Sequence, residues 1–541
     1  MPELVSRPLA SGFRPPGSGF RLLASAPPAS GFRFRHGVLS IYHMLPAQRV
    51  RSGFVGGLSR MRRLPGILAL GAAAILAGCA QAPLNAPLDP AALAANSPLG
   101  PGASAASGYN VRVQLASTSP DRVAVVLFFS GGGIRASALS YGVMQELALT
   151  PMPGGGNLLD RVQAISAVSG GCFPAAYYCL YGDRLFRDFE KTFLKQDVQG
   201  ELVHRFLSLR HRWRLMSDRY ARSDLAAEYY DELLFHGATY GDLLRGPATR
   251  PWLVINATDM DTFSTFSFTQ QSFDEIGSDL ARYPLSRAVA ASSAVPGILT
   301  PITLKTYADR VPPPPPVALL PSAPTVAAQA DAEPFVRLTQ TPIDPRRRAY
   351  VHLVDGGLAD NLGVSNLVDA LAATRGWSGL MRPEANSLRH IVFIVVNAAI
   401  EPKAEWSDHP ETPGLRAVAS ALSKSAIRRT NGVLLELVRR SVDDWNRDIA
   451  TGDWRPRLHL IAVDFAQLKD PAERAIFAQV PTTFTLPPET IDRLVTVGGR
   501  ILRDAPEFRN LMEEILRPPP AATVPPVPIA PANTARQRRL R

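Results

Sequence analysis

The chain has 541 residues, of which 46% are hydrophobic and 19% are charged, so it is long enough for one large core or two moderate ones. Its net charge of +11 is compatible with binding to nucleic acid or to an anionic membrane. The charge is concentrated at the start, because eight arginines and one glutamate give residues 1–60 a charge of +7, and Arg62 and Arg63 add two. The remaining +2 leaves the body of the protein near neutral, which argues against nucleic-acid binding.

The first 60 residues have the composition of a low-complexity extension. They repeat "SGFR" at 11–14, 18–21 and 30–33 among proline, alanine and serine. Such a segment lacks the large apolar side chains that a core requires. We therefore expect residues 1–60 to lie outside the working protein and Met61 to be the true start.

A signal sequence follows in "MRRLPGILALGAAAILAGCA", which begins at Met61. Two arginines precede an apolar run of signal-peptide length that is short for a membrane span. The run ends in "LAGC", which resembles the lipobox of bacterial lipoproteins; the alternative is an apolar anchor that is never cleaved. By this resemblance residues 61–78 are a signal peptide and Cys79 is the lipidated first residue of the mature protein.

Lipid chains on Cys79 would hold the protein on a membrane, because each buried methylene contributes about 0.8 kcal/mol. The expected location is the cell envelope of a Gram-negative bacterium, with no spanning helix in the mature chain. Ala80 is not the acidic residue that retains some bacterial lipoproteins in the inner membrane, so the outer membrane is favoured. The other cysteines, Cys172 and Cys179, are seven residues apart on one expected helix, where a disulfide is disfavoured, and should be core thiols.

A flexible tether is expected over 79–119, which is rich in alanine, proline, serine and glycine, and a globular domain over 120–516. Short apolar runs rich in β-branched residues predict buried strands at 123–129, 162–168, 251–257, 350–354, 390–396 and 458–465. Helical patterns between the runs predict helices at 136–149, 170–182, 200–217, 363–374, 413–447 and 488–503. Strands that alternate with helices favour an α/β domain with a mostly parallel central sheet.

Two further segments are rich in proline and alanine and do not belong to that scaffold. They are an insertion at 311–334 within the domain and a tail at 517–541. Both are expected to be extended or disordered, and neither carries recognisable chemistry.

A glycine loop follows the first strand in "FFSGGGIRA", residues 128–136. Its bare N–H groups could bind an anion, but the Lys-Ser/Thr end of a Walker loop is missing. A dinucleotide-binding loop fits formally, yet it requires an acidic residue after the next strand, which ends instead in "SAVSGG". Nucleotide binding is therefore disfavoured.

The second strand leads into "AVSGG", residues 167–171, which has the pattern of a nucleophile elbow. Ser169 stands between a strand and a helix, with Ala167 two residues before it and Gly171 two residues after. Ala167 replaces the first glycine of the motif, which adds one methyl group at that position. The helix N-terminus that follows favours an oxyanion near the serine, and the glycine loop would add donors at the same edge of the sheet.

A serine nucleophile needs a base. None of the histidines after the elbow stands in a supporting motif; they are His204, His211, His236, His352, His390, His409 and His459. Asp355 follows a predicted strand in "VDGGLADNLGV" and precedes two glycines that give a hydroxyl close access. A helix cap or an Asp-Gly turn would explain the same residues. We expect Asp355 at the carboxyl edge of a parallel strand, beside the elbow.

Taken together, the segments "SGGGIRA" (130–136), "AVSGG" (167–171) and "VDGG" (354–357) resemble the patatin-like phospholipase family, as does "AVAASSAVPGILTP" (288–301). The resemblance covers about 122–400 and implies an α/β three-layer sandwich. It implies a Ser–Asp dyad without histidine, no cofactor and no metal. Carried over by position, its site comprises the nucleophile Ser169, the base Asp355, the oxyanion-hole residues Gly131, Gly132 and Gly133, and the loop-supporting residues Arg135, Gly171, Gly356 and Gly357.

The expected function is a membrane-anchored acyl hydrolase that cleaves fatty-acyl esters of lipids or phospholipids. An acyltransferase could use the same dyad with an alcohol in place of water. A catalytically idle binding lipoprotein of the envelope is the alternative from another class. The sequence leaves the head group, the acyl-chain length and the oligomeric state open.

Overall fold

The computed structural model of the protein describes residues 84–89, 121–247, 249–311, 339–373, 376–377, 388–400, 410, 412, 414–449 and 456–517. All of them belong to one compact unit, Pro65–Arg541. The extension 1–60, the signal peptide 61–78 and Cys79 lie outside the described residues, as do the insertion and the tail apart from their first residues, 311 and 517. These assignments remain predictions.

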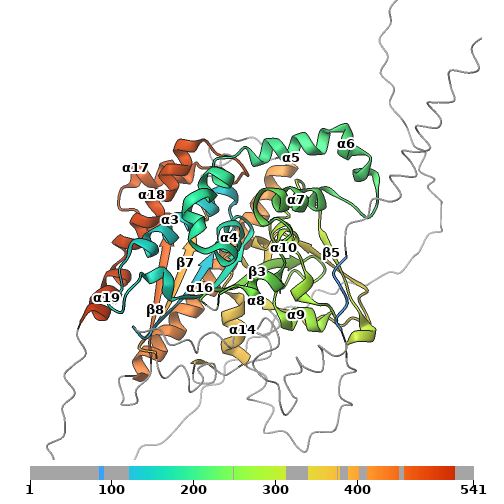
Figure 1. The fold of residues 1–541 in the computed structure, drawn as a ribbon. Coiled ribbons are helices and arrows are strands. Elements are labelled where there is room, and N and C mark those ends of the chain that lie inside the picture. Colours follow the sequence, from blue (N-terminus) through green and yellow to red (C-terminus); the bar gives the residue numbers. More distant parts are fainter. Residues whose placement is uncertain are drawn as a thin grey trace, which may run out of the picture. The chain divides into compact units, whose positions relative to one another are not determined.

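The described part of the chain is built on one mixed sheet of eight strands (Figure 1). Its order is β5-β6-β3-β2-β1-β7-β8, and β4 pairs with β3 beside this path. The strands are β1 (Val123–Phe129), β2 (Val162–Val168), β3 (Trp252–Asp259), β4 (Thr265–Ser267), β5 (Ile302–Lys305), β6 (Tyr350–Val354), β7 (His390–Asn397) and β8 (Arg457–Asp464). β3, β2, β1, β7 and β8 are parallel, so the predicted mostly parallel α/β sheet is confirmed.

The central strands are buried on both faces, which explains their nearly continuous apolar sequence. Side chains alternate between the faces along each strand. In β1, Leu127 and Phe129 pack into the larger hydrophobic cluster, whereas Phe128 packs into a second cluster on the opposite face. The sheet therefore separates two cores.

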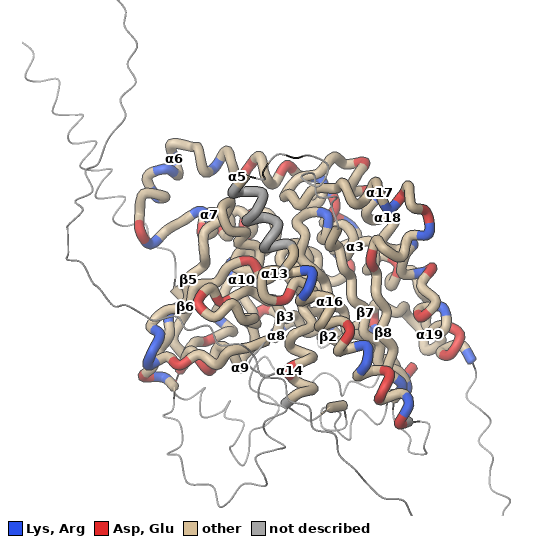
Figure 2. Tube along the Cα trace, turned by 180° about the vertical axis from the view of Figure 1, so that it is seen from behind, with Lys and Arg blue, Asp and Glu red and all other residues tan. Residues whose placement is uncertain are grey.

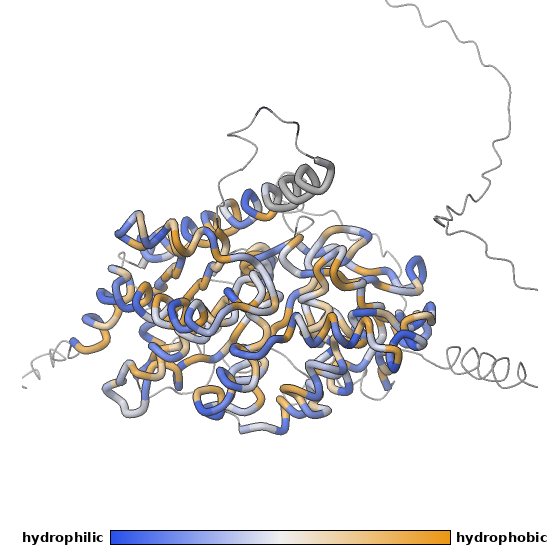
Figure 3. Tube along the Cα trace, turned by 90° about the horizontal axis from the view of Figure 1, so that it is seen from above, coloured by the Kyte–Doolittle hydropathy of each residue, from blue (hydrophilic) through white to orange (hydrophobic). Residues whose placement is uncertain are grey.

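Helices cover both faces of the sheet, so the predicted three layers are confirmed (Figures 1 and 3). The larger cluster includes residues of α3 (Gly133–Leu149), α4 (Cys172–Tyr181), α18 (Pro488–Asp504) and α19 (Pro506–Leu516). The second cluster includes residues of α14 (Ser365–Ala373) and α16 (Leu415–Ile449). α3 and α18 pack so closely that a Cβ at Gly142 would lie 2.0 Å from the Val495 carbonyl oxygen. Only glycine permits this approach.

The remaining described helices are short, and most of them also contribute residues to the larger cluster. They are α5 (Val198–Leu207), α6 (Leu209–Arg212), α7 (Arg222–Tyr230), α8 (Tyr240–Arg245), α9 (Gln270–Glu275), α10 (Leu285–Ser292), α13 (Gly357–Asp360) and α17 (Pro471–Ala478), with a π-helical segment at Leu185–Leu194. The predicted continuous helix over 200–217 is wrong. Ser208 is extended (φ −62°, ψ 131°) and separates α5 from α6, because Leu207 and Leu209 are exposed and have no core to hold them in one helix.

Part of the predicted tether packs against the domain. Leu88 is buried, and its N–H donates to the Gly277 carbonyl. The Asn85 side chain donates to the Ser278 hydroxyl and to the Lys305 carbonyl, and accepts from the Lys305 N–H at 2.7 Å. The expectation of a flexible segment is therefore wrong for 84–89, where one leucine and one asparagine supply apolar burial and specific hydrogen bonds.

Cys172 and Cys179 are buried free thiols, as predicted. Basic and acidic residues are interspersed along the described chain (Figure 2). Among the described residues there is no helix with the length and apolar character that crossing a bilayer requires.

Candidate active site

Ser169 occupies a strained turn between β2 and α4. Its φ is +48°, a left-handed value that costs a non-glycine residue free energy, and the side chain is buried. A 3₁₀ turn, Ser169–Gly171, continues directly into α4. A Cβ at Gly171 would lie 2.7 Å from the Phe129 Cβ, so β1 leaves no room for a larger residue there. These are the features of a nucleophile elbow.

The Ser169 hydroxyl donates a hydrogen bond to Asp355 Oδ2 at 2.8 Å. Asp355 immediately follows β6 and is 9% exposed. The two residues are 186 positions apart in the chain, and the sheet brings them together. This length is within the normal range for an O–H···O hydrogen bond.

The contact depends on how β2 and β6 share one edge of β3. Asn256 pairs with β2 on one side and with β4 on the other, and Thr258 pairs with β4 and β6. Because a strand residue has only two sides, β2 and β6 lie on the same edge of β3, one after the other. β2 runs parallel to β3 and β6 runs antiparallel to it, so their carboxyl ends face each other.

The expectation that Asp355 follows a parallel strand is therefore wrong. β6 is antiparallel to both of its neighbours, β3 and β5. The side chain nevertheless reaches Ser169, because β6 pairs only with the last two residues of β3 and ends where β2 ends.

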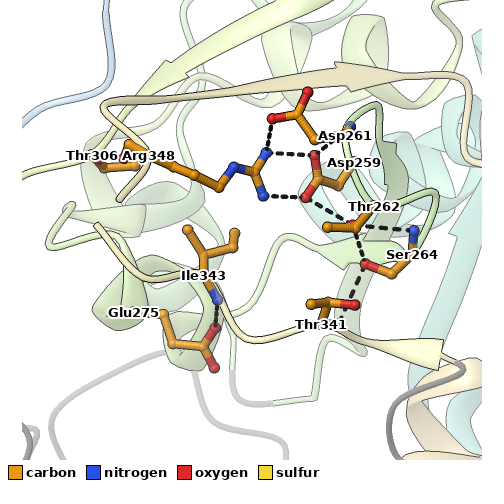
Figure 4. Close-up of polar contacts among 9 residues, drawn as sticks. All are labelled: Asp259, Asp261, Thr262, Ser264, Glu275, Thr306, Thr341, Ile343 and Arg348. Carbon is orange, nitrogen blue, oxygen red and sulfur yellow. Dashed lines mark hydrogen bonds and ion pairs between the residues drawn. The ribbon is translucent and has the colours of Figure 1, made fainter. Parts of the chain in front are cut away.

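An ion pair holds β6 in this register (Figure 4). Arg348, two residues before β6, makes a bidentate contact with Asp259 at the end of β3, with N···O distances of 2.6 and 2.8 Å. Asp259 is 2% exposed, and the Arg348 contact outweighs burial so that the pKa of Asp259 is lowered. Arg348 also contacts Asp261 at 2.9 Å. Bidentate pairs of this kind fix orientation as well as distance.

The Asp355 carboxylate is tuned for proton transfer near neutral pH. Burial raises its pKa to about 6, and hydrogen bonds from the Ser169 hydroxyl and the Gly357 N–H oppose that rise. The Gly357 bond reaches Oδ1 at 2.8 Å, which leaves Oδ2 facing the serine. A base with this pKa is ionised at neutral pH and still accepts a proton readily.

Sequence reasoning missed Ser292, at the end of α10. Its hydroxyl accepts from the Ser169 N–H at 2.8 Å and donates to the Asn256 carbonyl. Its own carbonyl accepts from the Gly356 N–H at 3.0 Å. Ser292 thus connects the elbow, β3 and the Asp355 loop. The only sequence signal was its place in "AVAASSAVPGILTP" (288–301), to which no role was attached.

The glycine loop lies directly against the elbow. A Cβ at Gly170 would be 2.1 Å from the Gly133 carbonyl oxygen, so the two backbones are in contact. Gly131 is not available as the predicted oxyanion donor, because its N–H already donates to the Asn361 carbonyl at 3.0 Å. The N–H groups of Gly132 and Gly133 make no hydrogen bond within the described part of the chain.

Arg135 supports this loop from the first turn of α3. The buried guanidinium donates to the Ala398 carbonyl at 2.9 Å, to the Val480 carbonyl at 2.6 Å and to the Thr482 hydroxyl at 3.0 Å. Burial lowers the pKa of Arg135 to about 10, so the side chain stays charged at neutral pH. The glycine loop is thereby attached to the segments that follow β7 and α17.

No described histidine is hydrogen-bonded to Ser169 or Asp355. His352 bonds to Thr303 on β5, and His409 lies outside the described residues. His390 and His459 contact each other, and burial, with nearby positive charge, lowers the pKa of His390 to about 4 and that of His459 to about 3. The other predicted residue, Gly356, follows Asp355; a Cβ there would lie 2.2 Å from the Asn256 carbonyl oxygen.

The fold and this geometry define an α/β protein with a serine–carboxylate pair at a strand-to-helix turn. Residues 127–368 match the sequence model of one family, described as patatin-like phospholipase. This part of the chain is therefore similar to patatin-like phospholipases. The matched span includes Ser169 and Asp355.

Solved structures of human GIVD cytosolic phospholipase A2 are also similar to the chain. One has 14% sequence identity and a TM-score of 0.36, and the match covers 75% of this chain and 64% of that chain. Another, in complex with methyl gamma-linolenyl fluorophosphonate, has 15% identity and a TM-score of 0.38, and the match covers 75% and 63%. The chain thus spans slightly less than two thirds of their length. No curated protein matches the chain.

Proposed function

We propose that the protein is a serine acyl hydrolase that cleaves fatty-acyl esters of lipids through a Ser169–Asp355 dyad. The observation that carries the proposal is the 2.8 Å hydrogen bond from the serine hydroxyl to a buried carboxylate at a strained elbow. The match of residues 127–368 to the patatin-like phospholipase model supports a lipid ester as the substrate class.

In the first step Asp355 takes the hydroxyl proton as Ser169 Oγ forms a bond to the acyl carbonyl carbon. The negative charge moves to the carbonyl oxygen, where the free N–H groups of Gly132 and Gly133 stabilise it. Each such donor contributes about 2.7–4 kcal/mol to lowering the barrier. The bond to the leaving alcohol then breaks, and Asp355 returns its proton to that alcohol.

In the second step water attacks the acyl-enzyme. Asp355 removes a proton from the water, which forms a bond to the acyl carbon. The bond to Ser169 Oγ breaks, the serine regains the proton from Asp355, and the fatty acid leaves. The strained turn keeps Ser169 Oγ at one position throughout both steps.

The test compares purified wild type with Ser169→Ala on phospholipid vesicles and on a short-chain aryl ester. Wild type should release fatty acid, and the variant should lose at least about 10⁴-fold in kcat, because the nucleophile is gone. Equal turnover of the two proteins would overturn the proposal. Adding a long-chain alcohol separates hydrolase from acyltransferase, since a transferase would form a new ester in place of free fatty acid.

We also propose that lipid chains on Cys79 anchor the enzyme in the envelope of a Gram-negative bacterium, by preference in the outer membrane. The lipobox-like "LAGC" and the apolar run before it support this. Because residues 84–89 pack on the domain, only the few residues between Cys79 and Asn85 would separate it from the lipid. Such a segment reaches at most about 20 Å, which would hold the site close to its substrate.

Anchoring is tested by expressing the full-length gene in a Gram-negative host with a labelled fatty acid. Wild type should carry the label and fractionate with outer membranes, and Cys79→Ser should carry none. Label on the Cys79→Ser protein, or unlabelled wild type, would overturn the anchor while leaving the hydrolase proposal intact.

A further inference from the structure

A second cluster of reactive side chains lies at the opposite end of the parallel strands from Ser169. His390 begins β7 and pairs with Val123 at the start of β1, whereas the elbow and glycine loop follow the ends of β2 and β1. β1 is seven residues long, so its two ends are about 20 Å apart. The cluster is therefore separate from the dyad.

Three residues from three elements face one another in this cluster. His390 on β7 pairs with Arg457 on β8, so His459, two residues further along β8, points to the same face of the sheet as His390. α19 supplies Glu514 on that face and lies beside β8 in both views (Figures 1 and 2). Both rings are almost fully buried, and the Glu514 side chain is 24% exposed.

The distances among the three ligand atoms match a metal site. His390 Nδ1 and His459 Nε2 are 3.0 Å apart, and each is 3.9 Å from Glu514 Oε2. A point equidistant from the three atoms lies about 2.1 Å from each, which is the length of zinc bonds to imidazole nitrogen and carboxylate oxygen.

A simple hydrogen bond between the two rings accounts for only part of this arrangement. The 3.0 Å separation fits such a bond, but Glu514 Oε2 is too far from either ring nitrogen to accept one. Arg457 binds the other carboxylate oxygen, Oε1, at 2.8 Å. This contact turns Oε2 toward the rings, as outer partners do for metal ligands.

We propose that His390, His459 and Glu514 form a binding site for a divalent transition-metal ion of the zinc type. Two neutral imidazoles and a carboxylate are a ligand set that suits zinc. The ion would join α19 to β7 and β8, and so attach the last described helix to the sheet. Its role is structural, because the cluster is at the far end of the strands from the dyad.

The test uses tag-free, full-length protein stripped with chelator and dialysed against zinc. Wild type should retain one zinc per chain, measured by mass spectrometry of the metal, and Glu514→Gln should bind it more than about 10-fold more weakly. Glu514→Gln changes one oxygen at a partly exposed position, so folding should be retained. The matched control is Glu513→Gln, the exposed neighbour on α19, which should bind like wild type.

Measuring the Tm with and without zinc is a second test of the same site. Zinc should raise the Tm of stripped wild type and of Glu513→Gln, with reversal by chelator, and should raise the Tm of Glu514→Gln less at the same zinc concentration. Equal zinc affinity in Glu514→Gln and wild type, or wild type that retains no stoichiometric metal, would overturn the proposal. His459→Ala should abolish binding, and its retention of a full equivalent would overturn it as well.

Discussion

The two halves of the sheet differ in direction and in regularity. β2, β1, β7 and β8 are parallel, seven or eight residues long, and covered on both faces. Beyond β3, the strands β4, β5 and β6 are three to five residues long and antiparallel to their neighbours. The first half supplies Ser169 and the glycine loop, and the second half supplies Asp355.

The dyad therefore depends on a joint between a regular half and an irregular half. Ser169 is placed by a long parallel strand with extensive core packing, so its position should be robust. Asp355 is placed by a five-residue strand that pairs with only two residues of β3. Contacts outside the strand, at Arg348 and Ser292, must secure it. Separate perturbations of each half test this difference.

The largest effect is expected from Asp355→Asn, which leaves the regular half intact and removes the base. Turnover should fall by about 10²–10⁴-fold, the contribution typical of general base catalysis. Wild-type kcat/KM should rise with pH through an apparent pKa of about 6, because the deprotonated carboxylate is the active form. Asp309→Asn, an exposed carboxylate in the segment between β5 and β6, serves as the control and should keep normal turnover and the same pH profile. Turnover that does not fall below pH 6 would contradict this assignment.

The same carboxylate should cost the folded protein stability. Its pKa is raised from 3.8 to about 6 by burial, so the folded state binds the proton more tightly than the unfolded chain does. Stability from this group is present at low pH and is lost as pH rises through that window, by at most about 3 kcal/mol. Asp355→Asn should thus gain Tm relative to wild type between pH 4 and pH 7. A constant difference in Tm across this range would contradict the shift.

Arg348→Ala removes the ion pair that connects the irregular half of the sheet to β3. It leaves Asp259 buried without its partner, which should lower the free energy of unfolding by about 3 kcal/mol. Because β6 then loses the ion pair that fixes its position against β3, kcat on the aryl ester should fall even at temperatures where the variant is folded. Arg346→Ala, an exposed neighbour, is the control. Lost stability with unchanged kcat would mean that β6 keeps its register without the ion pair.

Ser292→Ala should have the smallest effect. It removes the acceptor of the Ser169 N–H and the donor to Asn256, at a cost of about 1–3 kcal/mol in unfolding free energy. The matched control is Ser293→Ala, because that hydroxyl donates to the Val289 carbonyl of α10 and is not bonded to the elbow or to β3. If both variants lose the same stability and the same kcat, Ser292 has no special link to the elbow.

The regular half could be predicted from the sequence because its strands are continuous apolar runs. β1 and β2 have their predicted bounds, and β3, β7 and β8 differ by one or two residues. β4 and β5 were missed since three or four residues show no periodicity. The direction of β6 could not be predicted either, because it depends on which strand is its neighbour.

Some residues of the candidate active site could be predicted from the sequence and others could not. Ser169 and Asp355 stand in local motifs, so their residue types and flanking glycines identified them. Ser292 and Arg348 act through partners 123 and 89 positions away, and no local pattern marks such contacts. The bond that occupies the Gly131 N–H is also long-range in sequence, which is why all three glycines were expected to be free donors.

The most direct test of the dyad is covalent labelling with an alkyl fluorophosphonate, followed by peptide mass spectrometry. Wild type should be modified once, at Ser169, and the rate of labelling should fall at least about 10²-fold in Asp355→Asn, because the base no longer activates the hydroxyl. Labelling of another serine, or equal rates in the two proteins, would contradict the pairing of Ser169 with Asp355.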